Sequence, residues 1–378
     1  MADISYFRDI LTSPRRSDEL SRSGAKVVGT LCNFVPEEII LALGAAPLRL
    51  CSGDHLAARS AEDFVPVDLC PAAKATVGLL RAGEGFWGRL DLLVVPTSCD
   101  AKTKLPDLVG EETAVYRMLL PRSKRDDGAR RSWLEQTRRF AGEMESLAGR
   151  KLTVRALRGA IDLLNARQQA ARRLLALRTR PIPPISGEET LVVFGASFLD
   201  DPKRWTEQAN ALCDALEGEP EAPPGHAPKR MLLTGAPLVY PNLKLVRLIE
   251  GAGAVVVADD LCSGTERLYH PVTPREWSLP EMLRAIAERY LLPTTCPCFA
   301  ESEDRVNRLL SLAEEFGADG AVYHNLRMCP LFDIESRRVA SALRDAGVPT
   351  LILHTDYSPE DTAQLRTRVE AFLEMLGP

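Results

Sequence analysis

Buried strand-like runs alternate with helix-like runs along most of the chain, and this alternation constrains the fold more than any other feature. In the first third, apolar runs at 26–31, 47–50 and 90–95 predict buried strands, with helices at 36–43 and 71–80 between them. Regular alternation of this kind is typical of parallel sheets that carry helices on both faces. We therefore expect an α/β fold.

A charged helical stretch from 123 to 180 interrupts the alternation. Within it, Val154, Leu157 and Ile161 repeat at spacings of three and four, which predicts one apolar stripe on a charged helix. Such a stripe is typical of a packed connector whose arginines are solvated. The Pro-Ile-Pro-Pro sequence at 181–184 then ends the helical stretch and indicates a domain boundary.

The alternation resumes after this boundary. Strand-like runs lie at 231–234, 254–258, 320–324 and 350–354, and helix-like runs at 243–250, 281–290, 305–316, 333–345 and 359–376. We therefore expect two Rossmann-like parallel-sheet domains joined by a helical segment. The expected ranges are 1–122 for the N-terminal α/β domain, 123–185 for the helical connector packed on it, and 186–378 for the C-terminal α/β domain.

Composition and charge narrow the class of protein. The chain has 378 residues, of which 45% are hydrophobic and 26% charged, as in a soluble globular protein with two domains. Its net charge of −5 and interspersed charges argue against a nucleic-acid partner. No run approaches the roughly 18 apolar residues of a membrane helix, and the charged start does not fit a signal peptide. We expect a cytoplasmic protein without a membrane partner.

Nine cysteines in a reducing compartment are expected to be buried hydrophobes, ligands or redox thiols, because disulfides are rare there. Cys213 lies inside a helix-like run and Cys51 ends a strand-like run, so both are expected in the core. The other seven fall at predicted element ends beside Pro, Gly, Asp or Asn, as functional residues often do. They are Cys32, Cys70, Cys99, Cys262, Cys296, Cys298 and Cys329.

Cys70, Cys99 and Cys329 occupy the positions most favourable for a thiolate. Each follows a strand-like run or precedes a helix-like run, where the N-terminal N–H groups of a helix stabilise anionic sulfur. Pro71 and Pro330 suit the first helical position and leave the preceding cysteine as the cap. Ligands of parallel sheets bind beyond the carboxyl ends of the strands, so we expect the cysteines to gather at one edge and to bind metal.

The cysteine spacing leaves the metal open. Zinc sites usually show ligands in close pairs, whereas Cys70, Cys99 and Cys329 are far apart in the sequence. Scattered cysteines from several loops are compatible with an iron–sulfur cluster, whose inorganic sulfide reduces the number of protein ligands required. Three cysteines would leave one iron open for substrate. A cluster, zinc and no metal all remain possible from spacing alone.

Five motifs carry a family resemblance. They are GTLCNFVPEE at 29–38, LCPAAKATVG at 69–78, TSCDAKTKL at 97–105, VVVADDLCSG at 255–264 and HTDYS at 354–358. In this order they resemble the 2-hydroxyacyl-CoA dehydratase and benzoyl-CoA reductase family, of the 2-hydroxyglutaryl-CoA dehydratase D-component type. The resemblance covers nearly the whole chain.

The resemblance implies a cofactor, a reaction and partners. It places the three ligands of a [4Fe-4S] cluster at Cys70, Cys99 and Cys329, and it implies radical dehydration or reduction of a CoA thioester. The low-potential electron would come from a separate ATP-hydrolysing iron–sulfur activator, and the chain itself has no G-x-x-x-x-G-K-[ST] loop. The chain would pair with a homologous second subunit or with itself, as the catalytic or as a non-catalytic cluster-bearing subunit.

Additional cysteines also resemble the double-cubane branch of the family, in which six cysteines hold an [8Fe-9S] cluster that reduces small molecules. Cys32, Cys262 and the Cys296-Pro-Cys298 pair sit at the matching motif positions. Ordinary packing would also explain a cysteine after Leu31 or Leu261. The two branches therefore both remain open at this point.

Three further residues are candidates for chemistry. Glu37 opens a predicted helix, where a carboxylate either complements the helix dipole or contacts substrate. His324 and His354 end predicted strands at the expected site edge, where a histidine either transfers protons, acts as a ligand or bonds the backbone. The lysines that could meet CoA phosphates, or lie solvated on helix faces, are Lys74, Lys102 and Lys104.

Overall fold

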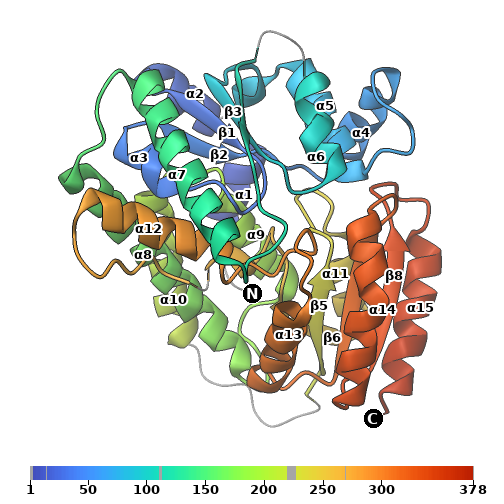
Figure 1. Cartoon of the computed structure of the whole chain (residues 1–378). Coiled ribbons are helices and arrows are strands. Elements are labelled where there is room, and N and C mark those ends of the chain that lie inside the picture. Colours follow the sequence, from blue (N-terminus) through green and yellow to red (C-terminus); the bar gives the residue numbers. More distant parts are fainter. Residues whose placement is uncertain (1–2, 14, 110–112, 219–226, 269, 378) are drawn as a thin grey trace.

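Two four-stranded parallel sheets, each covered by helices, form the computed structural model of the chain (Figure 1), which describes residues 3–13, 15–109, 113–218, 227–268 and 270–377. The first sheet has the order β2-β1-β3-β4 and the second β6-β5-β7-β8. The strands are β1 (Val27–Thr30), β2 (Ala46–Arg49), β3 (Leu92–Pro96), β4 (Val115–Met118), β5 (Lys229–Gly235), β6 (Ala254–Asp259), β7 (Gly320–Leu326) and β8 (Thr350–Thr355). The predicted α/β fold with two Rossmann-like sheets is confirmed.

The sequence of each strand explains its place in the sheet. The central strands β1 and β3 are buried at every position, as expected for short apolar runs covered by helices on both faces. The edge strand β4 is buried only at Met118, and its Val-Tyr-Arg-Met sequence shows no continuous apolar run. This strand was absent from the sequence prediction, because an edge strand need not be apolar on both faces.

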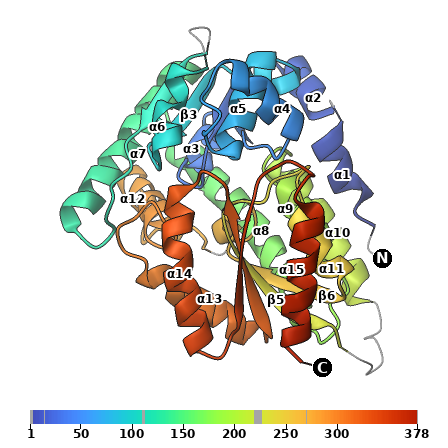
Figure 2. The same ribbon diagram turned by 90° about the vertical axis from the view of Figure 1, so that its right-hand side faces the viewer.

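The helices surround the two sheets, as two views at right angles show (Figures 1 and 2). Those up to residue 104 are α1 (Ser5–Thr12), α2 (Arg15–Ser23), α3 (Glu37–Ala42), α4 (His55–Ser60), α5 (Pro71–Ala82) and α6 (Asp100–Lys104). Those of the middle are α7 (Asp127–Ala148), α8 (Val154–Ala176), α9 (Gly187–Ala196) and α10 (Pro202–Glu217). The last are α11 (Lys244–Gly251), α12 (Leu279–Leu291), α13 (Glu303–Glu315), α14 (Pro330–Asp345) and α15 (Thr362–Met375).

The expected helical connector is a pair of long helices, α7 and α8. Gly149 ends α7 with a φ of 63°, a left-handed conformation that glycine adopts without a Cβ penalty. The first half of α8 contributes Leu157 and Ile161 to the core beneath the first sheet. Its second half contributes Ala171 and Leu174 to the core around the second sheet. The helix α8 therefore ties the two cores together.

Core packing also crosses the expected boundaries in two places. Helix α1, at the start of the chain, packs on α9 and places Phe7 in the core of the second sheet. Helix α12, from the last third, packs on α7 and joins the core of the first sheet. The two sheets are thus held in one arrangement by exchanged helices.

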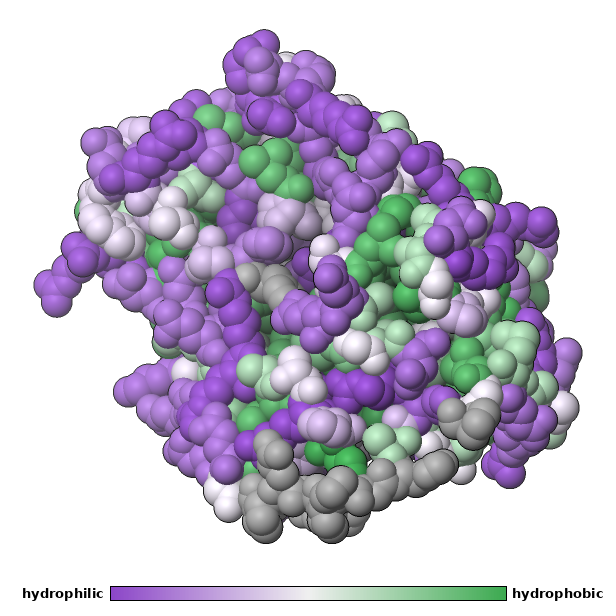
Figure 3. Space-filling model, turned by 90° about the horizontal axis from the view of Figure 1, so that it is seen from below, coloured by the Kyte–Doolittle hydropathy of each residue, from purple (hydrophilic) through white to green (hydrophobic). Residues whose placement is uncertain are grey.

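The outer surface is mixed in polarity. The face seen from below in Figure 3 is mainly hydrophilic, and its hydrophobic residues gather toward the right side of that view. No helix among the described residues is long and apolar enough to cross a membrane.

Candidate functional site

Six cysteines line a single cavity of about 90 Å³ between the two sheets, which we call the cysteine cavity. They are Cys32, Cys70, Cys99, Cys262, Cys296 and Cys329. Both sheets have their first strand between their second and third, so each has a switch point, between β1 and β3 or between β5 and β7. Ligands of such sheets bind beyond the carboxyl strand ends at this point. The cysteines of both domains follow strands that border the two switch points.

Cys70 and Cys329 are positioned alike. Each is the N-cap of a helix whose first residue is proline, at the start of α5 and of α14. The two thiols are hydrogen-bonded to each other, and this bond lowers the pKa of Cys70 to about 6 against the opposing effect of burial. Two backbone N–H groups, of Ala72 and Ala73, support the anionic sulfur. The pKa of Cys329 is raised correspondingly, so Cys70 is the thiolate of the pair.

Cys32 follows β1 with a φ of 61°, an uncommon conformation for a residue other than glycine. Its sulfur lies 3.1 Å from Ser98 Oγ and 2.6 Å from Lys102 Nζ. Burial tends to lower the pKa of Lys102, but the neighbouring cysteine sulfurs outweigh it and raise this pKa well above its ordinary value. Lys102 is therefore an ammonium group directed at the cysteines of the cavity.

The other three sulfurs are protonated in the metal-free chain. Burial raises the pKa of Cys99 and raises that of Cys262 to about 12. A hydrogen bond to Cys298, and then burial, raise the pKa of Cys296. Cys298 itself is buried in the core and is not among the residues lining the cavity. Because metal ligands must be deprotonated, cation binding here would release protons.

Polar side chains hold the loops that carry these cysteines. Glu266 accepts from Asn33 Nδ2 at 2.7 Å and from the backbone N–H of Thr295 at 2.8 Å, which joins loops of both domains. Arg305 donates to the Thr295 carbonyl at 3.0 Å and lies 3.6 Å from Asp260. Among the described residues, no group of three or more His, Cys, Asp and Glu side chains is arranged to hold a single metal ion.

The two histidines lie outside the lining of the cysteine cavity. His324 is buried in β7 with Nδ1 2.8 Å from the Ala236 carbonyl oxygen. Burial lowers its pKa to about 4, so it is neutral at neutral pH. His354 lies in the edge strand β8 with Nε2 2.7 Å from Asp333 Oδ1, on the exposed side of the molecule. The sequence-based roles of both in proton transfer stay predictions.

Glu37 is buried in α3 between two cations. Its carboxylate is 2.5 Å from Arg167 of α8 and also forms an ion pair with Arg267. Burial opposes ionisation, but the two guanidinium groups outweigh it and lower the pKa of Glu37 to about 2. The carboxylate does not line the cysteine cavity. Its contacts therefore tie α3, α8 and the loop after β6 together.

The lysines fall into different environments. Lys74 is buried and lies 2.7 Å from Glu62, while Lys104 is exposed and lies 3.5 Å from Asp107. Lys102 alone of the three lines the cysteine cavity. The sequence analysis offered it as a phosphate contact or a solvated residue. Its position three residues after the N-cap Cys99 in a short helix was the available signal, but its direction depends on the fold.

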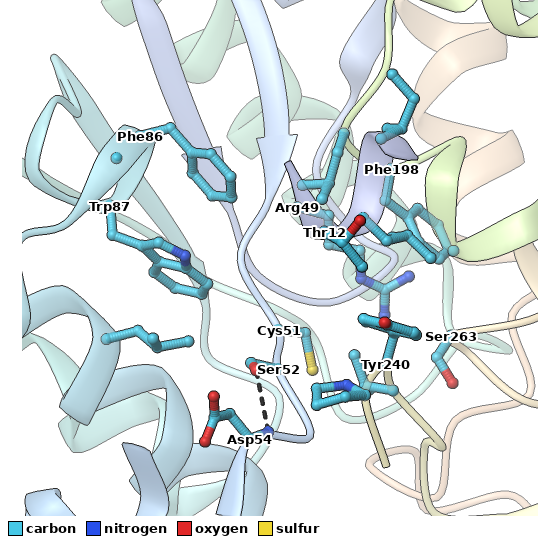
Figure 4. Close-up of a pocket in the computed structure, with 18 of the residues that line it drawn as sticks. Thr12, Arg49, Cys51, Ser52, Asp54, Phe86, Trp87, Phe198, Tyr240 and Ser263 are labelled. Atoms are coloured by element: carbon cyan, nitrogen blue, oxygen red, sulfur yellow. Dashed lines mark hydrogen bonds between the residues drawn. The ribbon is translucent and has the colours of Figure 1, made fainter. Parts of the chain in front are cut away.

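Cys51 was expected in the core, and the structure differs. It lines a second pocket of about 480 Å³ between the domains, together with Arg49, Phe86, Trp87 and Phe198 (Figure 4). We call this the Arg49 pocket. Cys213, by contrast, is fully buried in the core around the second sheet, as predicted.

Comparison with known proteins decides the family. The family model described as "2-hydroxyglutaryl-CoA dehydratase, D-component" matches residues 32–376. The chain belongs to this family.

Three relatives show the breadth of this dehydratase family. The chain is 32% identical to "Putative dehydratase subunit YjiM" of Escherichia coli, over 95% of this chain and 93% of that protein. It is 22% identical to "(R)-phenyllactyl-CoA dehydratase beta subunit" of Clostridium sporogenes, over 98% and 97%. It is 23% identical to one of the subunits of the benzoyl-CoA reductase of Thauera aromatica, over 91% and 89%. The expected family resemblance is confirmed.

Proposed function

We propose that this family member holds an iron–sulfur cluster in the cysteine cavity, with Cys70, Cys99 and Cys329 as ligands of a [4Fe-4S] core. It would accept low-potential electrons from an ATP-hydrolysing activator for the radical dehydration or reduction of a CoA thioester. The observation that carries the proposal is that six cysteines from both domains line one cavity. Cysteine thiolates that surround a cavity suit a polynuclear cluster, whose irons each need only one of them.

The residues of the chain supply the binding site and its electrostatics. When bound, such a cluster supplies one-electron transfer and, with three protein ligands, an open iron for a substrate oxygen. Cys70 is already a thiolate, so it offers a first ligand without deprotonation. Lys102 brings a positive charge to the cavity, which offsets the anionic sulfurs. The Glu266 and Arg305 contacts hold the ligand loops in place.

A second subunit is part of the proposal. The relatives from Clostridium sporogenes and Thauera aromatica are both named as subunits, so each is one part of a larger enzyme. By analogy, this chain would act with a homologous partner or as a dimer. Co-purification of the native complex would identify that partner.

A double-cubane cluster is the second candidate, and one observation favours it. Cys32, Cys262 and Cys296 line the same cavity as the three expected ligands. With Cys296 chosen over the buried Cys298, each domain would supply cysteines to a set of six. A protein of this kind would reduce a small molecule instead of a CoA thioester.

The deciding experiment measures iron and acid-labile sulfide per chain after strictly anaerobic purification. About four irons per chain would support a single cubane, and about eight would support the double cubane. Alanine variants of Cys70, Cys99 and Cys329 should each lose iron, while the matched core variant Cys213→Ala should retain it. Equal loss in all four variants, or iron-free protein after anaerobic reconstitution, would refute the proposal.

A further inference from the structure

The Arg49 pocket is separate from the cysteine cavity but shares a wall with it. Arg49 lines the pocket, and its Nη1 donates to Asn33 Oδ1 at 2.7 Å and to the Cys262 carbonyl. Asn33 and Cys262 both line the cysteine cavity. The next residue, Ser263, lines the Arg49 pocket instead. One layer of side chains and backbone therefore separates the two spaces.

The pocket has the size and character of a small-molecule site. Its volume of about 480 Å³ lies within the range of roughly 300–1,000 Å³ that is typical of ligand pockets. On one side the stacked rings of Phe86 and Trp87 form an aromatic wall, with centroids 5.5 Å apart. On the other side lie Phe198 and Arg49, with Cys51 between the two walls (Figure 4). An apolar body would fit between these rings.

Arg49 is an unusual buried cation. Only 5% of its surface is exposed, and its guanidinium stacks over the Phe198 ring at 4.6 Å. No carboxylate among the described residues forms an ion pair with it, and within that part of the chain only Nη1 has protein acceptors. A buried cation is costly unless an anion accompanies it. Nε and Nη2 are therefore available to an anionic ligand.

The charge of the pocket limits that ligand to a small monoanion. Of the described residues lining the pocket, Arg49 is the only Lys or Arg, while Asp54 and Glu84 are acidic. One cation can balance one carboxylate, but the phosphates of CoA carry several negative charges. Asp54 and Glu84 would repel them. The pocket thus favours a free acid over its CoA thioester.

A second polar group lies beside Arg49. Ser263 is 6% exposed, and its buried hydroxyl has no hydrogen-bond partner. Buried hydroxyls normally find a partner, because an unmade bond is destabilising. A rotation about its side chain would allow it to donate to a carboxylate held by Arg49.

From these contacts we infer that the Arg49 pocket binds a small organic carboxylate with an aromatic or apolar body, its acid group on Arg49 and its body against Phe86 and Trp87. The site goes beyond the proposed function, because its lining contains none of the six cavity cysteines. It would place the acid one side-chain layer from the cysteine cavity. Binding does not require a cluster to be present.

Calorimetric titration of the full chain with phenylacetate tests the inference, with phenylacetamide as the neutral control of equal shape. We expect the amide to bind about 10- to 100-fold more weakly, the usual range for losing a charged hydrogen bond. Phenylacetyl-CoA should not compete for the site. Equal binding of acid and amide, or no binding of phenylacetate at millimolar concentration, would overturn the inference.

Variants of Gly195 test the location without removing Arg49 from its structural contacts. Gly195 lies in α9 and lines the pocket, and a Cβ there meets only Leu11, at ordinary contact distances from 3.7 Å. Gly195→Leu should fill the pocket and abolish phenylacetate binding, whereas Gly195→Ala should preserve it. Retained binding in Gly195→Leu would refute the assignment. Titrating the metal-free chain as well separates this result from the cluster proposal, since only the latter fails if no iron is found.

Discussion

The substitution Glu37→Gln tests whether this carboxylate is structural. The wild-type side chain lies buried between Arg167 and Arg267, and the variant would leave both guanidinium groups without their counter-charge. The pKa of Glu37 falls from 4.5 to about 2, and each pKa unit corresponds to about 1.4 kcal/mol, so its ionisation contributes about 3 kcal/mol at neutral pH. Removing one partner of a buried ion pair typically costs about 3–5 kcal/mol. We therefore expect a loss of about 3 kcal/mol in the free energy of unfolding.

The assay is urea unfolding followed by circular dichroism, with the anaerobic protein at several pH values. The matched control is Glu188→Gln, which removes the partner of the exposed Arg247 at 2.8 Å and should cost less than about 1 kcal/mol. Because the folded-state pKa is lowered, the wild-type advantage is complete above about pH 4.5 and declines as the pH falls toward 2.

Two results would refute this reasoning. A loss of less than about 1 kcal/mol for Glu37→Gln would show that the buried pairs contribute little. Alternatively, a normally stable variant that has lost turnover would return Glu37 to the substrate role that the sequence left open. A destabilised variant that retains its iron per folded chain would support the structural role.

Two other predictions concern the cysteines and the helix that carries Cys70. In the metal-free chain, iodoacetamide should label Cys70 with a half-maximal rate near pH 6, whereas Cys262 should need pH values near 12, as peptide mass mapping would show. Similar pH profiles would contradict the hydrogen bond from Cys329. Gly78→Ala should destabilise the protein by about 1–3 kcal/mol, because its Cβ would lie 2.0 Å from the Ala57 carbonyl oxygen in α4. The helical control Gly159→Ala meets nothing within 4 Å and should be neutral or stabilising in the same thermal unfolding measurement.

Local patterns in the sequence were sufficient for the strands and for the placement of the cysteines. Continuous apolar runs such as Leu-Leu-Val-Val in β3 predict buried parallel strands, because both faces of such a strand are covered. Residues that follow such strands must lie at one edge of the sheet. This geometry explains why a prediction from sequence placed Cys99 and Cys329 near each other. Edge strand β4 escaped detection, since its solvated side chains show no such pattern.

Tertiary packing decided what surrounds those cysteines. The direction of Lys102, the lining of the Arg49 pocket and the exclusion of Cys298 from the cavity depend on how the two sheets face each other. Residues far apart in the chain meet there, such as Glu37 and Arg267. Local propensity determines each strand and helix, because its apolar pattern is set within a few residues. The pairing of charges and the shape of the cavities arise only when the helices, above all α8, join the two cores.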